Sequence, residues 1–293
     1  MRATRSYLVC CTQRTGSTLL GAALRRTGIA GNPTEYFDPK FFSSKRFNST
    51  ALALPEQQAA TPKPQGGLFT RLRESHDRVM DASVTDNGVF GAKVHWSQLG
   101  YLFRMLVARG VPGADAPEYS VRTLQAYFPD LRFIFLRRMN KVAQAISAFR
   151  ARRSGVYALD RRTGDRGPDA GTDISYEFTD IDRQVAEFVQ ADEGWAGLLE
   201  PVADLTLALT YEELSADYEG AVHRVLRHLD LSPNKPIAPP SLRKQADTVS
   251  LEWERRYRQQ VNDRRAGEIG RAAAPDIGIE YLHGADRQDV HKS

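Results

Sequence analysis

Near its N-terminus the chain reads SYLVCCTQRTGSTLLGAALRRTG, Ser6–Gly28, an apolar run followed by a polar loop and an amphipathic segment. The apolar run SYLVCCT is bounded by polar residues and predicts a buried strand. In TLLGAALRRTG, Leu20 and Leu24 share one helical face, and Gly28 is typical of a helix C-terminus. These residues predict a strand, a tight loop and a helix in direct succession.

Strand candidates alternate with helix candidates along the rest of the chain. The predicted strands are Gly88–Trp96, Leu131–Arg138 and Leu205–Tyr211, and the predicted helices are 141–153, 181–199, 217–231 and a charged helix in the tail. This alternation predicts an α/β fold with a mostly parallel sheet flanked by helices on both faces.

The domain organisation follows from the absence of a dividing linker in the sequence. We expect a single domain over residues 1–293. Two segments predict flexible excursions from it. Residues 48–68 are rich in Ala, Pro, Gln and Gly, and residues 161–173 are charged and rich in Gly.

Composition restricts the class of protein. Lys+Arg is 40 and Asp+Glu is 36, a net charge of +4, and so small an excess does not indicate a nucleic-acid partner. The two cysteines, Cys10 and Cys11, are adjacent and match neither a disulfide framework nor a zinc site. The sequence shows no signal peptide and no apolar run of about 20 residues. We expect a soluble protein of the cytoplasm without a membrane span.

The loop QRTGST after the first strand has the features of an anion site. At the carboxyl end of a parallel strand, a helix N-terminus offers unpaired backbone N–H groups and a positive dipole end. Gly16 allows close backbone approach, Thr15, Ser17 and Thr18 add hydroxyls, and Arg14 adds a permanent cation. The competing interpretation is an ordinary polar turn between strand and helix.

A nucleoside-triphosphate loop would differ from this one at two positions. Its pattern is G-x-x-x-x-G-K-[ST], whereas here Cys11 occupies the position of the first glycine and Ser17 that of the lysine. The six His are dispersed and no carboxylate motif stands out. The loop therefore predicts an anion bound without a metal.

Five segments in order resemble one family of enzymes. They are YLVCCTQRTGSTLL, GIAGNPTEYFDP, GVFGAKVHW, FLRRMNKVAQAISAFRA and LRKQADTVSLEWERRYR. The set resembles the carbohydrate sulfotransferases that use 3′-phosphoadenosine-5′-phosphosulfate (PAPS), typified by trehalose 2-sulfotransferase and related to the enzymes that sulfate nodulation factors and lipopolysaccharide. The resemblance implies a P-loop-like sulfotransferase fold, PAPS as donor and a sugar or glycoconjugate as acceptor. It also suggests a homodimer.

The resemblance implies a second anion pocket, for the 3′-phosphate of the donor. This role falls on Arg138 at a strand end and on Ser147 in the following helix. Arg137 is the alternative, because neighbouring strand residues face opposite sides. The wider superfamily usually has Arg-Asn-Pro where this chain has Arg138-Met139-Asn140, which leaves the local backbone open. The tail residues Arg243 and Lys244 are expected to close over the nucleotide.

Candidate catalytic residues come from the second and third segments. Glu35 aligns with the proposed general base of the family. His95 is its competitor, because an imidazole titrates near neutral pH, although a satisfied strand histidine is the simpler interpretation. Lys93 is expected to hold the transferring sulfonate or the acceptor.

Three aromatic residues, Tyr36, Phe37 and Trp96, are candidates for the apolar face on which a sugar ring rests, against the default that such residues belong to the core. Two other classes of function stay open from the residues alone. They are a kinase or other nucleotide-binding protein on the same kind of sheet, and a non-catalytic anion-binding relative.

Overall fold

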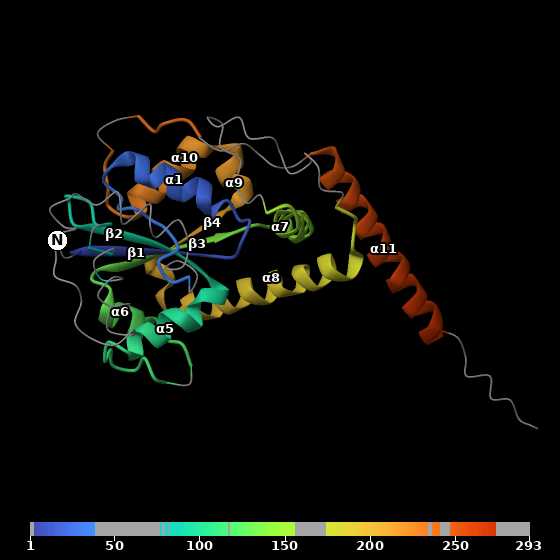
Figure 1. The fold of residues 1–293 in the computed structure, drawn as a ribbon, viewed down its shortest axis with the longest axis horizontal. Coiled ribbons are helices and arrows are strands. Elements are labelled where there is room, and N and C mark those ends of the chain that lie inside the picture. The colour runs from blue at the N-terminus through green and yellow to red at the C-terminus, as the bar shows by residue number, and fades with distance from the viewer. Residues whose placement is uncertain are drawn as a thin grey trace, which may run out of the picture.

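The computed structural model describes residues 3–38, 77, 80–81, 83–116, 118–155, 174–233, 236–240 and 247–273. The two expected excursions, 48–68 and 161–173, lie outside these ranges, as do Arg243 and Lys244. The α/β fold expected from the sequence is confirmed, with a parallel sheet between helices (Figure 1).

The sheet contains four strands, all parallel, in the order β2-β1-β3-β4. Their bounds are Arg5–Cys11 for β1, Val89–His95 for β2, Leu131–Arg137 for β3 and Thr206–Thr210 for β4, which confirms every predicted strand to within a residue. Cys11 is level with His95 of β2 and with Leu136 of β3. Because the strands are parallel and in this register, their carboxyl ends meet at one edge of the sheet.

The predicted helices are confirmed as α1 (Ser17–Thr27), α7 (Lys141–Ser154), α8 (Phe178–Leu199), α10 (Tyr218–His228) and α11 (Thr248–Ala273). Helices α5 (Leu99–Val107), α6 (Val121–Tyr127) and α9 (Tyr211–Ala216), and the 3₁₀ turns η1 (Trp96–Gln98) and η2 (Glu200–Leu205), were not expected. Each of these unexpected elements has nine residues or fewer, too short for a helical repeat to be read reliably from sequence. Among the described helices, none combines the length and apolar character needed to cross a membrane.

Side chains of the central strand β1 alternate between two cores. Leu8 and Cys10 face a core shared with α5, α6 and α8, whereas Tyr7 and Val9 face one shared with α1 and α10. Figure 1 shows these two sets of helices on opposite faces of the sheet. A third cluster joins α7, α8 and the first part of α11, where Tyr257 donates to Asp182 at 2.6 Å. With both faces covered, the carboxyl edge is the part of the sheet that remains available to a ligand.

A glycine in β2 tests the packing beneath this edge. A Cβ on Gly91 would lie 2.3 Å from Cζ of Tyr7, a fully buried ring whose hydroxyl donates to the carbonyl of Ala30 at 2.7 Å. We expect Gly91→Ala to lower the free energy of unfolding by about 1–3 kcal/mol, as overpacked cores do, measured by urea denaturation. The matched control is Gly197→Ala in α8, where a Cβ meets nothing within 4 Å and stability should rise by about 0.5–1 kcal/mol.

Candidate active site

The loop between β1 and α1 has the geometry expected for anion binding. Gly16 is the N-cap of α1 with φ 80°, and no side chain caps the helix there. A positive φ is also found at Arg14, at 65°. The hydroxyl of Thr15 is buried and donates to the carbonyl of Thr12 at 2.9 Å, so it closes the loop. The first amides of α1, beside the exposed Thr18, are therefore available to an anion.

The structure brings Arg14, Arg138 and Ser147 together. Nε of Arg14 donates to Oγ of Ser147 at 2.9 Å, and Nη1 of Arg138 donates to the carbonyl of Arg14 at 3.4 Å. The loop QRTGST, residues 13–18, which we call the anion loop, and the predicted second anion pocket are therefore adjacent. Arg137 points elsewhere, with its guanidinium 5.8 Å from the ring centre of Phe135 in the core on the α8 side.

Tyr211 connects these two parts, and sequence reasoning missed it. The guanidinium of Arg138 stacks 4.5 Å from the Tyr211 ring centre, while a Cβ on Gly16 would lie 2.8 Å from Cδ2 of the same ring. Burial lowers the pKa of Arg138, and the ring face offers the cation a favourable contact in that setting. Tyr211 is the first residue after β4, so its place at the end of a predicted strand was the available signal.

The turn after β3 explains the replacement of the usual proline by Asn140. The backbone N–H groups of Met139 and Asn140 donate to the Glu212 carboxylate at 3.1 and 3.2 Å, and a proline at 140 could not donate. The Asn140 side chain caps α7 by accepting from the Ala143 N–H at 3.0 Å. The turn is thus held from two sides, and Arg138 keeps its place at the strand end.

Glu35 is placed by a segment that runs beside β2. Thr34 forms a parallel bridge with Ala92, and its carbonyl accepts from the Lys93 N–H at 2.9 Å. Oε1 of Glu35 consequently lies 2.8 Å from Nζ of Lys93. The same ammonium donates to Oγ1 of Thr18 at 3.2 Å. Lys93 therefore links the carboxylate to the anion loop.

His95 and Gln98 complete the surroundings of this carboxylate. Nδ1 of His95 lies 3.8 Å from Oε2 of Glu35, which is longer than a hydrogen bond. Nε2 of Gln98 donates to the same oxygen at 3.1 Å. Gln98 was not expected as a site residue, although it lies three residues after His95, at the end of the turn that follows β2.

The three aromatic candidates have different positions. Tyr36 is fully buried and donates to the carbonyl of Asn32 at 2.6 Å, and Phe37 is 1% exposed, edge-on to Phe128. Their burial corrects the expectation that they form an acceptor surface, because they belong to the core next to α6. Trp96 is partly exposed and packs edge-on against Trp195 at 5.3 Å.

The adjacent cysteines have no place in this chemistry. Burial raises the pKa of the Cys11 thiol to about 12 and that of Cys10 well above its ordinary value, so neither supplies a thiolate nucleophile at neutral pH. Among the described residues, no group of three or more His, Cys, Asp and Glu side chains could hold a metal ion.

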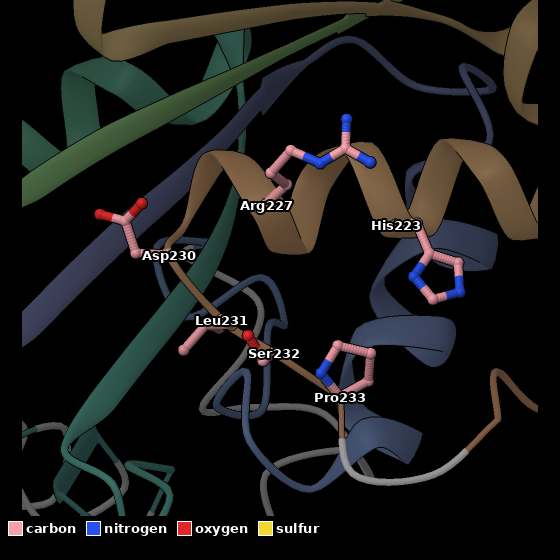
Figure 2. A pocket seen from close by; sticks show the side chains of 6 residues that line it. All are labelled: His223, Arg227, Asp230, Leu231, Ser232 and Pro233. Carbon is pink, nitrogen blue, oxygen red and sulfur yellow. The ribbon is translucent and has the colours of Figure 1, made fainter.

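A pocket away from this edge is lined by the end of α10 and the residues after it (Figure 2). Arg5, the first residue of β1, and Arg132, the second residue of β3, donate to the carbonyls of Leu229 and His228 there. The pocket therefore lies at the amino edge of the sheet. The lining residues are His223, Arg227, Asp230, Leu231, Ser232 and Pro233, and none of them is a predicted site residue.

Comparison with known proteins agrees with this arrangement. Residues 6–260 match the family model described as Stf0 sulphotransferase. The chain belongs to this family. It is therefore a sulfotransferase, and the family expected from the sequence is confirmed. The match includes both the anion loop and the segment that carries Glu35.

Relatives and a solved structure extend the comparison. A trehalose 2-sulfotransferase of Mycobacterium tuberculosis is 28% identical over 272 residues, 89% of this chain and 97% of the relative. One of Mycolicibacterium smegmatis is 28% identical over 265 residues, 87% and 94% of the two chains. The sulfotransferase domain from the curacin biosynthetic pathway shares the fold, with a TM-score of 0.50 and 13% identity. The comparison covers 85% of this chain and 83% of that domain.

Proposed function

We propose that this sulfotransferase transfers the sulfuryl group of PAPS to a hydroxyl of a sugar or glycoconjugate similar to trehalose. One observation carries the proposal. The Glu35 carboxylate lies 2.8 Å from Lys93, whose ammonium also donates to Thr18 of the anion loop. A base and a cation are thus held together beside the place where an anionic donor would bind.

The donor side of the site fits a nucleotide with two separate anionic groups. The amides of residues 15–18 and the guanidinium of Arg14 would hold the 5′-phosphosulfate. Arg138 and Ser147 would hold the 3′-phosphate. Nε of Arg138 is buried, and none of the described residues accepts a hydrogen bond from it. Because buried donors normally have partners, this donor supports the proposal that a ligand binds beside Arg138.

The chemistry follows from these positions. Glu35 would take the proton of the acceptor hydroxyl as its oxygen forms a bond to sulfur. The sulfur–oxygen bond to the donor phosphate breaks, and Arg14 and the loop amides would receive the charge left on that phosphate. Lys93 would leave Glu35 for the sulfonate. His95 remains the alternative base, at 3.8 Å from Glu35.

The acceptor is proposed from the relatives and from the chemistry of the site. Both named relatives act on trehalose, and Trp96 offers a partly exposed ring at the end of β2. A kinase is not favoured, because Ser17 stands where a triphosphate loop has its lysine.

Nucleotide binding tests the two anion pockets. Without magnesium, we expect adenosine 3′,5′-bisphosphate to bind more tightly than adenosine 5′-monophosphate and ATP by calorimetry. Arg138→Ala should lower the affinity for the bisphosphate by about 10- to 100-fold, which corresponds to the loss of one charged hydrogen bond. The affinity for the monophosphate should stay unchanged. The control is Arg224→Ala, because Arg224 forms an exposed ion pair with Glu213. Equal affinities of the wild type for mono- and bisphosphate would refute the second pocket.

Transfer itself is measured with radiolabelled PAPS and trehalose in the absence of magnesium. Sulfated trehalose supports the proposed acceptor. Bisphosphate binding with no transfer to trehalose or to a panel of other sugars would instead indicate a non-catalytic relative.

The remaining expectations belong to the same proposal. The strands of residues 5–210 form one sheet, which supports a single domain. We also propose a cytoplasmic location, a homodimer, no nucleic-acid partner, and closure of Arg243 and Lys244 over the nucleotide.

A further inference from the structure

The hydrogen bonds of Gln98 distinguish this side chain from an ordinary buried amide. It is 6% exposed and lies at the end of η1, three residues after His95. Its Oε1 accepts from the backbone N–H of His95 at 3.0 Å, and its Nε2 donates to Oε2 of Glu35 at 3.1 Å. Each end of the amide therefore has a defined partner.

These partners determine which way the amide faces. A backbone N–H can only donate, so the atom of Gln98 that meets it must be the oxygen. The nitrogen is consequently directed at Glu35, and a flipped amide would place two donors against each other. Gln98 is thus a hydrogen-bond donor of fixed direction, held by the strand that also carries Lys93.

Both oxygens of the Glu35 carboxylate are held by donors. Lys93 lies 2.8 Å from Oε1 and Gln98 lies 3.1 Å from Oε2. Lys93 has a second partner in Thr18 on the anion loop, so it is placed to exchange Glu35 for an anionic ligand. Gln98 would then be the contact that keeps the carboxylate in place.

We infer that Gln98 is a positioning residue that orients Glu35 toward the acceptor hydroxyl during transfer, a role that rests on the proposed function of Glu35 as base. It holds Oε2 from the side of η1, while Oε1, which is paired with Lys93, would face the acceptor once Lys93 binds the sulfonate. It also favours the ionised form, because a donor to a carboxylate stabilises its charge. Among the residues that the structure describes, Lys93 and His95 of β2 and Cys11 of β1 are charged or titratable groups close to Glu35.

Two variants of Gln98 test this role. Gln98→Leu keeps the size but removes both hydrogen bonds. Gln98→Glu keeps the acceptor for the His95 N–H and changes only the group that faces Glu35 from a donor to a second carboxylate. The matched control is Gln184→Leu in α8, a glutamine that is 5% exposed and donates to Oε2 of Glu187 at 2.8 Å.

The first readout is the titration of the Glu35 carboxyl by ¹³C NMR, with its signal assigned by its loss in Glu35→Gln. The midpoint should rise by about one pH unit in Gln98→Leu, a tenfold weaker preference for the ionised form. It should rise further in Gln98→Glu, because two close carboxylates resist double ionisation. The Gln184→Leu protein should titrate like the wild type. An unchanged midpoint in both Gln98 variants would overturn the inference.

The second readout is transfer to trehalose as a function of pH. The acidic limb of kcat should move in the same order as the NMR midpoints, with bisphosphate affinity unchanged. In a Glu35→Gln background, Gln98→Leu should cause no further loss of transfer, and a further loss would show that Gln98 acts independently of Glu35. If the midpoints move but the rate profile does not, the contact between Gln98 and Glu35 stands and the assignment of Glu35 as base fails.

Discussion

Glu35→Gln is expected to lower the rate of sulfuryl transfer by about 10²–10⁴-fold, the contribution of general base catalysis. Glutamine has nearly the same shape and can still accept from Gln98, but it cannot take a proton from the acceptor hydroxyl. The side chain is 14% exposed, and Lys93, which lies 2.8 Å from it, is not one of the residues proposed to hold the bisphosphate. Affinity for adenosine 3′,5′-bisphosphate should therefore stay at the wild-type value.

The measurement is initial rate with saturating PAPS, beside calorimetry of the bisphosphate. Glu200→Gln, an exposed carboxylate at the start of η2, controls for the loss of one negative charge. A wild-type rate in Glu35→Gln would exclude Glu35 as the base. His95→Gln would then become the variant to measure, because His95, 3.8 Å from Glu35, is the alternative base.

The second large effect is expected from Arg14. Its guanidinium lies between the anion loop and α7, where Nε donates to Ser147 at 2.9 Å. Arg14→Ala removes a cation from the position where charge grows on the leaving phosphate. We expect transfer to fall by about 10²–10³-fold, the range seen when one donor to a developing anion is lost.

Arg14→Lys separates charge from geometry. Lysine keeps the positive charge but lacks the planar guanidinium that holds two oxygens at once. The transfer rate of Arg14→Lys should therefore lie between those of Arg14→Ala and the wild type. Arg14 has a φ of 65°, and alanine and lysine, neither of which is glycine, meet a similar steric cost there. The comparison between the two variants therefore reports the side chain. Arg25→Ala, at the far end of α1, should transfer at the wild-type rate. Equal rates for Arg14→Ala and wild type would remove Arg14 from the site.

Much of the fold could be predicted from local pattern. Each strand of the sheet is a short apolar run between polar residues, and the helices α1, α7, α8 and α10 follow from their periodicity. The anion loop could be predicted as well, because its glycine, hydroxyls and arginine are consecutive. The short elements α6, α9 and η1 could not, since they contain too few residues to show a repeat.

The aromatic residues show where local pattern reaches its limit. Tyr36, Phe37 and Trp96 are all aromatic, and each lies within two residues of a predicted site residue. Tyr36 is fully buried, whereas Trp96 retains partial exposure. Burial is the sum of what all neighbouring elements cover, and α6 and α8 were not placed relative to these residues by any local signal.

Three features follow from the order of amino acids alone. The composition of the anion loop and its position between a strand and a helix are properties of neighbouring residues. The parallel character of the sheet follows from the alternation of strands and helices along the chain. The contacts of Glu35 with Lys93 and Gln98, and of Arg138 with Tyr211, join segments far apart in the chain. They depend on the register of β2 against β1 and on the common edge at which parallel strands end. Such contacts form only when the sheet is assembled, because no local preference of either partner encodes the distance between them.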